Sequence, residues 1–236
     1  MIFENKTVVL TGVGRPGQLG EVVAGAFAAR GARLVVVDVE AGEAEARAAA
    51  IRAAGGDARG LGCDLTDAAQ VAALAGDVGA VAAGRVDALV NMAGGFAMSG
   101  PVDESEVAVW HRMIEINLTT AYVATRAFLP LLRSTRGAIV YFASAAVLPG
   151  GRGGGMAAYA AAKSGVLALM RAVADEERET GVRANAIAPT TIRTAANVAA
   201  MGDSARYVER EAVAETVLFL CSDRAGAITG QAVRLA

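Results

Sequence analysis

The stretch Thr7-Val8-Val9-Leu10-Thr11-Gly12-Val13-Gly14-Arg15-Pro16-Gly17-Gln18-Leu19-Gly20 decides the fold. Its first five residues are apolar or β-branched and favour a buried strand, whereas residues 19–30 favour a helix. The glycines between them let the backbone turn and come close to a pyrophosphate, which binds at the start of a helix. A glycine motif alone is a weak signal, and an ordinary turn is the alternative. This one follows a predicted strand and opens a predicted helix, which is the context that the interpretation requires.

The rest of the chain alternates between short apolar runs and Ala-rich helical stretches. Most of the apolar runs are continuous, which is typical of strands buried on both faces of a sheet. The predicted strands are Thr7–Thr11, Arg33–Asp38, Ala58–Cys63, Asp87–Asn91, Ala138–Ala143, Arg183–Ala188 and Ala232–Leu235. The predicted helices are Leu19–Arg30, Ala41–Ala54, Asp67–Ala75, Glu104–Leu132, Ala157–Glu179 and Glu209–Cys221. Right-handed crossovers would join them into an α/β fold, a Rossmann-type doubly wound, seven-stranded parallel sheet with helices on both faces.

Composition limits the class of protein. The chain has 236 residues, of which 54% are hydrophobic and 19% charged, so we expect a single domain over residues 1–236. The net charge of −2 and the scattered basic residues do not indicate nucleic-acid binding. No apolar run approaches the about 18 residues of a membrane span, and the N-terminal residues lack the layout of a signal peptide. We therefore expect no membrane partner and a cytoplasmic protein.

Residues that bind metals are scarce. Cys63 and Cys221 are the only cysteines, so a disulfide framework is not expected. His111 is the only histidine, which excludes a histidine-based metal site and any Ser-His-Asp triad that does not use it. We interpret His111 as a structural or surface residue and predict no metal site.

The second predicted strand ends in an acid. Asp38 follows Leu34-Val35-Val36-Val37, about 20 residues after the glycines, where a carboxylate can accept hydrogen bonds from ribose hydroxyls. A carboxylate there would repel a 2′-phosphate, so NAD(H) is favoured. Arg15 in the glycine segment could reach such a phosphate, so NADP(H) is not excluded. Asp38 could also cap the following helix.

Tyr159 and Lys163 lie in Ala157-Ala158-Tyr159-Ala160-Ala161-Ala162-Lys163, which favours a helix. Their four-residue spacing puts both side chains on one helical face, where an ammonium would favour the phenolate and make a proton donor and acceptor. A surface Tyr beside a solvated Lys is the alternative. Lys6 and Lys163 are the only lysines among 22 basic residues, which suggests a specific need for an ammonium.

Together these features resemble the short-chain dehydrogenase/reductase family over essentially the whole chain. Further matching segments occur in the family's order. They are Asp64-Leu65, Asn91-Met92-Ala93-Gly94, Ile116-Asn117-Leu118, Phe142-Ala143-Ser144, Asn185–Pro189 with Ile192-Arg193-Thr194, Phe219–Asp223 and Ile228–Gln231. The resemblance implies an oxidoreductase that transfers a hydride between NAD(P)(H) and a small-molecule secondary alcohol or ketone, and it implies a homodimer or homotetramer.

The resemblance also implies a role for each matching residue. Tyr159 would give a proton to a carbonyl oxygen or take one from an alcohol, while Ser144 would hold that oxygen. Lys163 would lower the pKa of Tyr159 and bind the nicotinamide ribose. Asn117 would position a water that links Lys163 to solvent. The implied coenzyme contacts are Gly12, Arg15, Gly17, Gln18, Leu19, Gly20, Asp38, Asp64, Leu65, Asn91, Ala93, Gly94, Tyr159, Lys163, Pro189, Ile192 and Thr194.

Three segments depart from the family's pattern. The glycine segment is longer, and Gln18 stands where the middle glycine is usual. Ser144 and Tyr159 are separated by a glycine cluster at residues 150–155, which predicts an enlarged substrate-facing loop. The stretch Ala195–Arg206 is short and leaves room for little of the helical lid that relatives have.

Two other functions remain open. One is an NADPH-dependent 3-oxoacyl-thioester reductase, and the other is a non-catalytic coenzyme-binding sensor or scaffold, which the short lid suggests. An enoyl-thioester reductase is less consistent with the sequence, because those relatives space their Tyr and Lys more widely.

Overall fold

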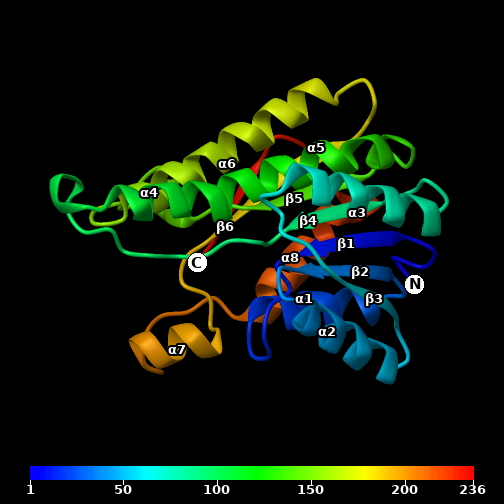
Figure 1. Cartoon of the computed structure of the whole chain (residues 1–236), viewed down its shortest axis with the longest axis horizontal. Coiled ribbons are helices and arrows are strands. Elements are labelled where there is room, and N and C mark those ends of the chain that lie inside the picture. The colour runs from blue at the N-terminus through cyan, green and yellow to red at the C-terminus, as the bar shows by residue number, and fades with distance from the viewer.

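The computed structural model describes residues 1–236, which form one parallel sheet of seven strands in the order β3-β2-β1-β4-β5-β6-β7 (Figure 1). The strands are β1 Thr7–Thr11, β2 Arg33–Asp38, β3 Asp57–Gly62, β4 Ala88–Asn91, β5 Ala138–Phe142, β6 Arg183–Pro189 and β7 Ala232–Leu235. The order reverses between β1 and β4, as in a doubly wound sheet. This confirms the predicted fold class.

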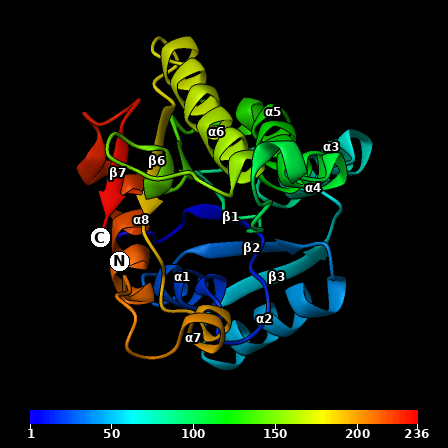
Figure 2. The same ribbon diagram turned by 90° about the vertical axis from the view of Figure 1, so that its left-hand side faces the viewer.

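Helices cover both faces of the sheet (Figure 2). They are α1 Leu19–Ala28, α2 Ala41–Ala53, α3 Ala68–Val81, α4 Val107–Ile114, α5 Thr120–Arg133, α6 Ala157–Glu176, α7 Ala195–Met201 and α8 Arg210–Cys221. Helices α1, α2 and α8 lie on one face, and α3, α4, α5 and α6 lie on the other. None of these helices is long and apolar enough to cross a membrane.

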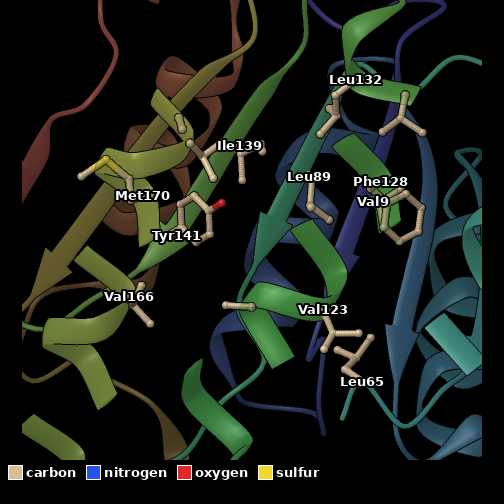
Figure 3. Close-up of a cluster of buried hydrophobic side chains, with 14 of the residues drawn as sticks. Val9, Leu65, Leu89, Val123, Phe128, Leu132, Ile139, Tyr141, Val166 and Met170 are labelled. Atoms are coloured by element: carbon tan, nitrogen blue, oxygen red, sulfur yellow. The ribbon is translucent and has the colours of Figure 1, made fainter. Parts of the chain in front are cut away.

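Each face of the sheet has its own hydrophobic core. On one face, Phe128 of α5 and Met170 of α6 pack against strand residues such as Val9 and Ile139 (Figure 3). On the other, side chains of α1 and α8, including Phe27, pack against the opposite faces of the same strands. Burial on both faces explains why the strands read as continuous apolar runs. The sheet therefore gives its carboxyl-end loops a rigid base.

The predicted helix Glu104–Leu132 is wrong in its middle. A π-helical turn at Glu115–Thr119 separates α4 from α5, and Asn117 lies in it. The side-chain amide of Asn117 donates to Met113 O at 3.0 Å and to Gly95 O at 3.0 Å, so it bonds both to the preceding turn and to a loop outside the helix. Apolar periodicity alone does not reveal such a turn, because a single turn of π-helix leaves the sequence pattern helical. Local π-turns often occur at functional sites.

Two other helix predictions need correction. Helix α3 runs to Val81 rather than ending at Ala75, although Gly76 and Gly79 disfavour helix. Gly79 lies close to Leu131 of α5, so a small residue suits this contact between helices. The segment after Thr194 contains α7, which was not predicted, because its seven residues are too few for a clear pattern.

Candidate functional site

The candidate site lies at the carboxyl ends of β1, β2, β4 and β5. The parallel register brings the glycine segment after β1, Asp38 at the end of β2, Asn91 at the end of β4 and Ser144 after β5 to one edge of the sheet. Ligands of doubly wound sheets bind at this edge, where the strand order reverses. The structure thus brings together residues from distant parts of the sequence.

Tyr159 lies in the first turn of α6 and faces Ser144. The Ser144 hydroxyl lies close enough to the Tyr159 hydroxyl to act on its pKa, and Ser144 Oγ accepts from Ala146 N at 3.3 Å. The bond from Ala146 caps the short helical turn Ala145–Val147 and holds the Ser144 side chain at the strand end. Two hydroxyl groups therefore converge where a substrate oxygen could bind both.

Lys163 lies one turn further along α6 and is buried. Its Nζ donates to Phe142 O at 2.9 Å and lies 5.8 Å from the centroid of the Tyr159 ring. The fold therefore excludes the alternative of a solvated surface lysine. Burial lowers the pKa of Lys163 to about 8, because the charged form is poorly solvated.

The pKa of Tyr159 differs from expectation. Burial raises it, and the hydrogen bond from Ser144 opposes that rise. The prediction that Lys163 lowers the pKa of Tyr159 is therefore not borne out by the protein's own groups. The physical reason is that burial acts on both residues, disfavouring the phenolate and the ammonium alike.

Asn117 joins this group through the segment after β4. Its Oδ1 accepts from Gly95 N at 3.1 Å. A Cβ built on Gly94 would lie 2.5 Å from Asn117 Oδ1 and 3.5 Å from Lys163 Nζ. Only glycine fits at residue 94, which has a φ of 157°, and the bare backbone there lets the Asn117 and Lys163 side chains approach the same point.

The glycine segment fits a dinucleotide pyrophosphate. Gly12 has a φ of 66°, and a Cβ there would lie 2.5 Å from Ala93 Cα, so glycine is needed for β1 and the β4 loop to meet. A Cβ on Gly20 would clash with Val13 O, so α1 begins directly against the loop. Gln18, the N-cap of α1, makes no side-chain bond to the first-turn amides, which leaves them available to an anion. Leu19 begins the helix, and Arg15 is exposed on the loop.

Glu21 was missed in the sequence, although it belongs to this loop. Its Oε2 accepts from Gly17 N at 2.7 Å and its Oε1 pairs with Arg47 Nη1 at 3.1 Å. The Gly17 bond is the main cause of the lowered pKa of Glu21. The lengthened loop is thus attached to α1 and α2. The available signal was an acid in the first turn of a helix, four residues after a glycine.

Asp38 lies where a ribose would bind. Its Oδ2 accepts from Gly14 N at 2.8 Å and its Oδ1 accepts weakly from Glu40 N at 3.3 Å. Asp38 is half-buried and does not cap α2, because the N-cap residue is Glu40. Each carboxylate oxygen keeps a lone pair for a sugar hydroxyl.

The other implied coenzyme residues make their own contacts within the protein. Asp64 Oδ1 accepts from Thr66 N and Oγ1 at 2.9 and 2.7 Å, and Leu65 is buried in the core. Asn91 Nδ2 donates to Thr125 at 3.2 Å, while its buried Oδ1 has no partner in the protein. Any coenzyme contact of the buried Leu65 would therefore come from its backbone, whereas Asp64 is exposed and keeps its Oδ2 free of protein partners.

The segment after β6 packs on the glycine loop. Pro189 ends β6, Ile192 pairs with Val208 in a parallel bridge, and Thr194 caps α7 by accepting from Asn197 N at 3.2 Å. Ala195 N then donates to Gly17 O at 3.2 Å. The short lid therefore contacts the glycine loop.

A second missed residue is Phe96. Its ring meets the Tyr159 ring edge to face, with centroids 5.1 Å apart and planes at 84°. An aromatic residue shortly after a strand-end glycine was the only available signal. His111, in contrast, is exposed on α4, and the structure contains no group of three or more His, Cys, Asp or Glu residues suited to a metal.

The glycine turn lies where the strand order reverses, beside a buried lysine and two neighbouring hydroxyls, and this arrangement is typical of nicotinamide-dependent oxidoreductases. Comparison with known proteins gives the family. A family model described as enoyl-(acyl carrier protein) reductase matches residues 12–235. The 2-(S)-hydroxypropyl-CoM dehydrogenase 3 of Xanthobacter autotrophicus is 34% identical, over 98% of this chain and 94% of its own. The D-threitol dehydrogenase of Mycolicibacterium smegmatis is 35% identical, over 97% and 90%.

A solved structure agrees. A putative NAD(P)-dependent gluconate 5-dehydrogenase from Beutenbergia cavernae, with NADP bound at low occupancy, is 32% identical with a TM-score of 0.86, covering 98% of this chain and 95% of its own. The chain belongs to the short-chain dehydrogenase/reductase family, which confirms the resemblance seen in the sequence. It is an oxidoreductase that acts on CH–OH groups and binds NAD(P).

Proposed function

We propose that one domain, residues 1–236, carries both the coenzyme and catalytic sites and interconverts a secondary alcohol and a ketone, with Tyr159 as the general acid and base. The observation that carries this is the closeness of the Ser144 and Tyr159 hydroxyls next to the buried Nζ of Lys163. In reduction, the Tyr159 hydroxyl protonates the carbonyl oxygen as the carbon gains a hydride. In oxidation, the proton and hydride leave by the reverse path.

The neighbouring residues support that proton transfer. Ser144 donates to the substrate oxygen and stabilises its developing negative charge together with Tyr159. Lys163 holds a positive charge beside the reacting groups, where it favours negative charge that develops on the substrate oxygen. Asn117 and Lys163 converge at Gly94, so a water held there could return a proton to the site.

The coenzyme would supply or accept the hydride when bound. The glycine segment and the α1 amides would hold its pyrophosphate, and Asp38 would accept from the ribose hydroxyls. Lys163 would bind the nicotinamide ribose, and Thr194 would lie on the nicotinamide side. The other coenzyme contacts that the family resemblance implies remain predictions.

We propose NAD(H) as the preferred coenzyme, because the Asp38 carboxylate would repel a 2′-phosphate. Asp38→Asn keeps an oxygen for Gly14 N and removes the charge. The ratio of kcat/KM with NADP to that with NAD should rise by about tenfold or more, since one like-charge contact is removed. Steady-state kinetics with both coenzymes measure this. Asp57→Asn, on an exposed residue at the start of β3, is the matched control. A wild type that prefers NADP would contradict the assignment.

The other candidate functions have weaker support. An NADPH-dependent 3-oxoacyl-thioester reductase would require the opposite coenzyme preference. The matching family model is described as enoyl-(acyl carrier protein) reductase, but the four-residue spacing of Tyr159 and Lys163 favours carbonyl chemistry. A sensor or scaffold would need neither two neighbouring hydroxyls nor a buried ammonium.

We also propose a cytoplasmic homodimer or homotetramer. Trp110 on α4 and Tyr122 on α5 are 45% and 52% exposed, and such large apolar side chains suit an interface. Light scattering after size exclusion should give two or four times the chain mass of 23.8 kDa. Tyr122→Glu should lower the measured molar mass toward that of one chain, whereas Val81→Glu, at an exposed residue of α3, should leave it unchanged. A monomeric wild type would contradict this proposal.

A further inference from the structure

Two large apolar side chains beside the catalytic tyrosine face solvent. Phe96 and Met98 are each 58% exposed, although Phe96 packs edge to face on Tyr159 at 5.1 Å. Adjacent exposed apolar side chains beside a reactive group indicate a surface that a ligand covers.

The segment carrying these side chains is fixed relative to Tyr159. Gly155 O, four residues before Tyr159, accepts from Ser99 N at 2.8 Å, Gly100 N at 3.1 Å and Ser99 Oγ at 3.3 Å. Met98 Cε lies 2.9 Å from the place that a Cβ on Gly155 would take. The enlarged loop before α6 thus supports the Phe96 segment, and its glycine at 155 makes room for Met98.

The lid does not cover this surface. Helix α7 is attached to the glycine loop through Ala195 N and Gly17 O, and Tyr207 Oη donates to Gly202 O at 2.6 Å. Figures 1 and 2 show α7 on the side of α1 and α2, away from α4 and α6. The short lid therefore leaves Phe96 and Met98 open for a substrate group.

The surrounding loops carry little charge. Residues 92–101 and 144–151 contain no Asp, Glu, Lys or Arg, and Arg152 is the first charged residue after Ser144. A ligand portion lying on Phe96 would therefore meet apolar side chains rather than an ion partner. Charged substrates would gain nothing from this wall.

We propose that Phe96 and Met98 form a specificity-determining wall that selects ketones and secondary alcohols carrying an aromatic or extended alkyl group on the reacting carbon. The proposal rests on the carbonyl chemistry proposed for Tyr159. The apolar group packs on Phe96 and Met98 while the oxygen lies between Ser144 and Tyr159. Small polar ketones can reach the hydroxyls but leave the wall exposed.

The test measures kcat/KM for 4-phenylbutan-2-one and for hydroxyacetone. In the wild type the aryl ketone should be the better substrate. Phe96→Ala should lower its kcat/KM by about ten- to a hundredfold, and Met98→Ala by a smaller factor, with hydroxyacetone changed less than about threefold. Phe96→Leu should recover part of the loss. Val81→Ala, on a 57% exposed residue of α3, is the control.

The outcomes separate the two proposals. Equal losses for both ketones in Phe96→Ala would mean that the ring only positions Tyr159, and would overturn the selectivity proposal. So would unchanged kinetics, or a wild type that prefers hydroxyacetone or an anionic 2-oxo acid. A wild type that binds coenzyme but reduces no ketone overturns the proposed function itself, and with it this inference. Phe96 is exposed, so melting temperature and coenzyme affinity should stay within error of the wild type.

Discussion

Tyr159→Phe should lower turnover by about a thousandfold while leaving coenzyme binding unchanged. The substitution removes only the hydroxyl that exchanges a proton with the substrate, and general acid–base catalysis contributes about a hundred- to ten-thousandfold. The ring still packs against Phe96, so the fold and the substrate wall are kept. The loss should fall on kcat rather than on KM, because the proton moves only in the transition state.

Initial rates with a ketone and reduced coenzyme, together with coenzyme titration by fluorescence, test this expectation. Tyr122→Phe is the matched control, since Tyr122 is 52% exposed on α5. Retained coenzyme binding without turnover is the expected pattern for Tyr159→Phe. Unchanged turnover would contradict the proposed mechanism and favour the sensor or scaffold alternative.

Lys163→Met should give the second largest loss, about a hundred- to a thousandfold in kcat/KM, with weaker coenzyme binding. Methionine fills a similar volume but supplies no charge to Tyr159 and no donor to Phe142 O. Lys163→Arg should not restore activity, because the larger guanidinium must fit a fully buried position. Lys6→Met is the control, because Lys6 is the only other lysine and pairs with Asp223 at 2.8 Å, away from the site.

The pH dependence gives Lys163 a separate signature. Burial lowers its pKa to about 8, so the ammonium predominates below that pH and is lost above it. The reduction rate of the wild type should be flat below about pH 8 and fall above it, and Lys163→Met should lack that inflection. An inflection that persists in the variant would assign the titration to another group.

Lys163→Met should lower activity without lowering thermal stability. A lysine whose pKa is lowered in the folded state costs stability at any pH where the unfolded chain would hold the proton. Lys163→Met should therefore melt at the same temperature as the wild type or higher at pH 7. A lower melting temperature would indicate that the Phe142 bond outweighs the desolvation cost. Catalytic residues commonly oppose stability in this way.

The site was only partly visible in the sequence. Tyr159 and Lys163 were predicted from their helical spacing, and Ser144 from the resemblance to the family, and the fold brings the three together. Glu21 and Phe96 were missed, because each acts through one contact made across the fold, to Gly17 N and to the Tyr159 ring. The pKa of Tyr159 was expected to fall, yet burial, which depends on every surrounding side chain, raises it.

By itself, the sequence determined the seven strands and their parallel direction, because continuous apolar runs separated by helices admit few arrangements. It also determined the glycine turn, where the positive φ values favour glycine. The tertiary structure alone decided where α4 breaks, how far α3 extends, and that the short lid lies on the glycine loop rather than over Phe96. Those outcomes depend on packing between segments distant in the chain, and local residue preference carries no information about such contacts.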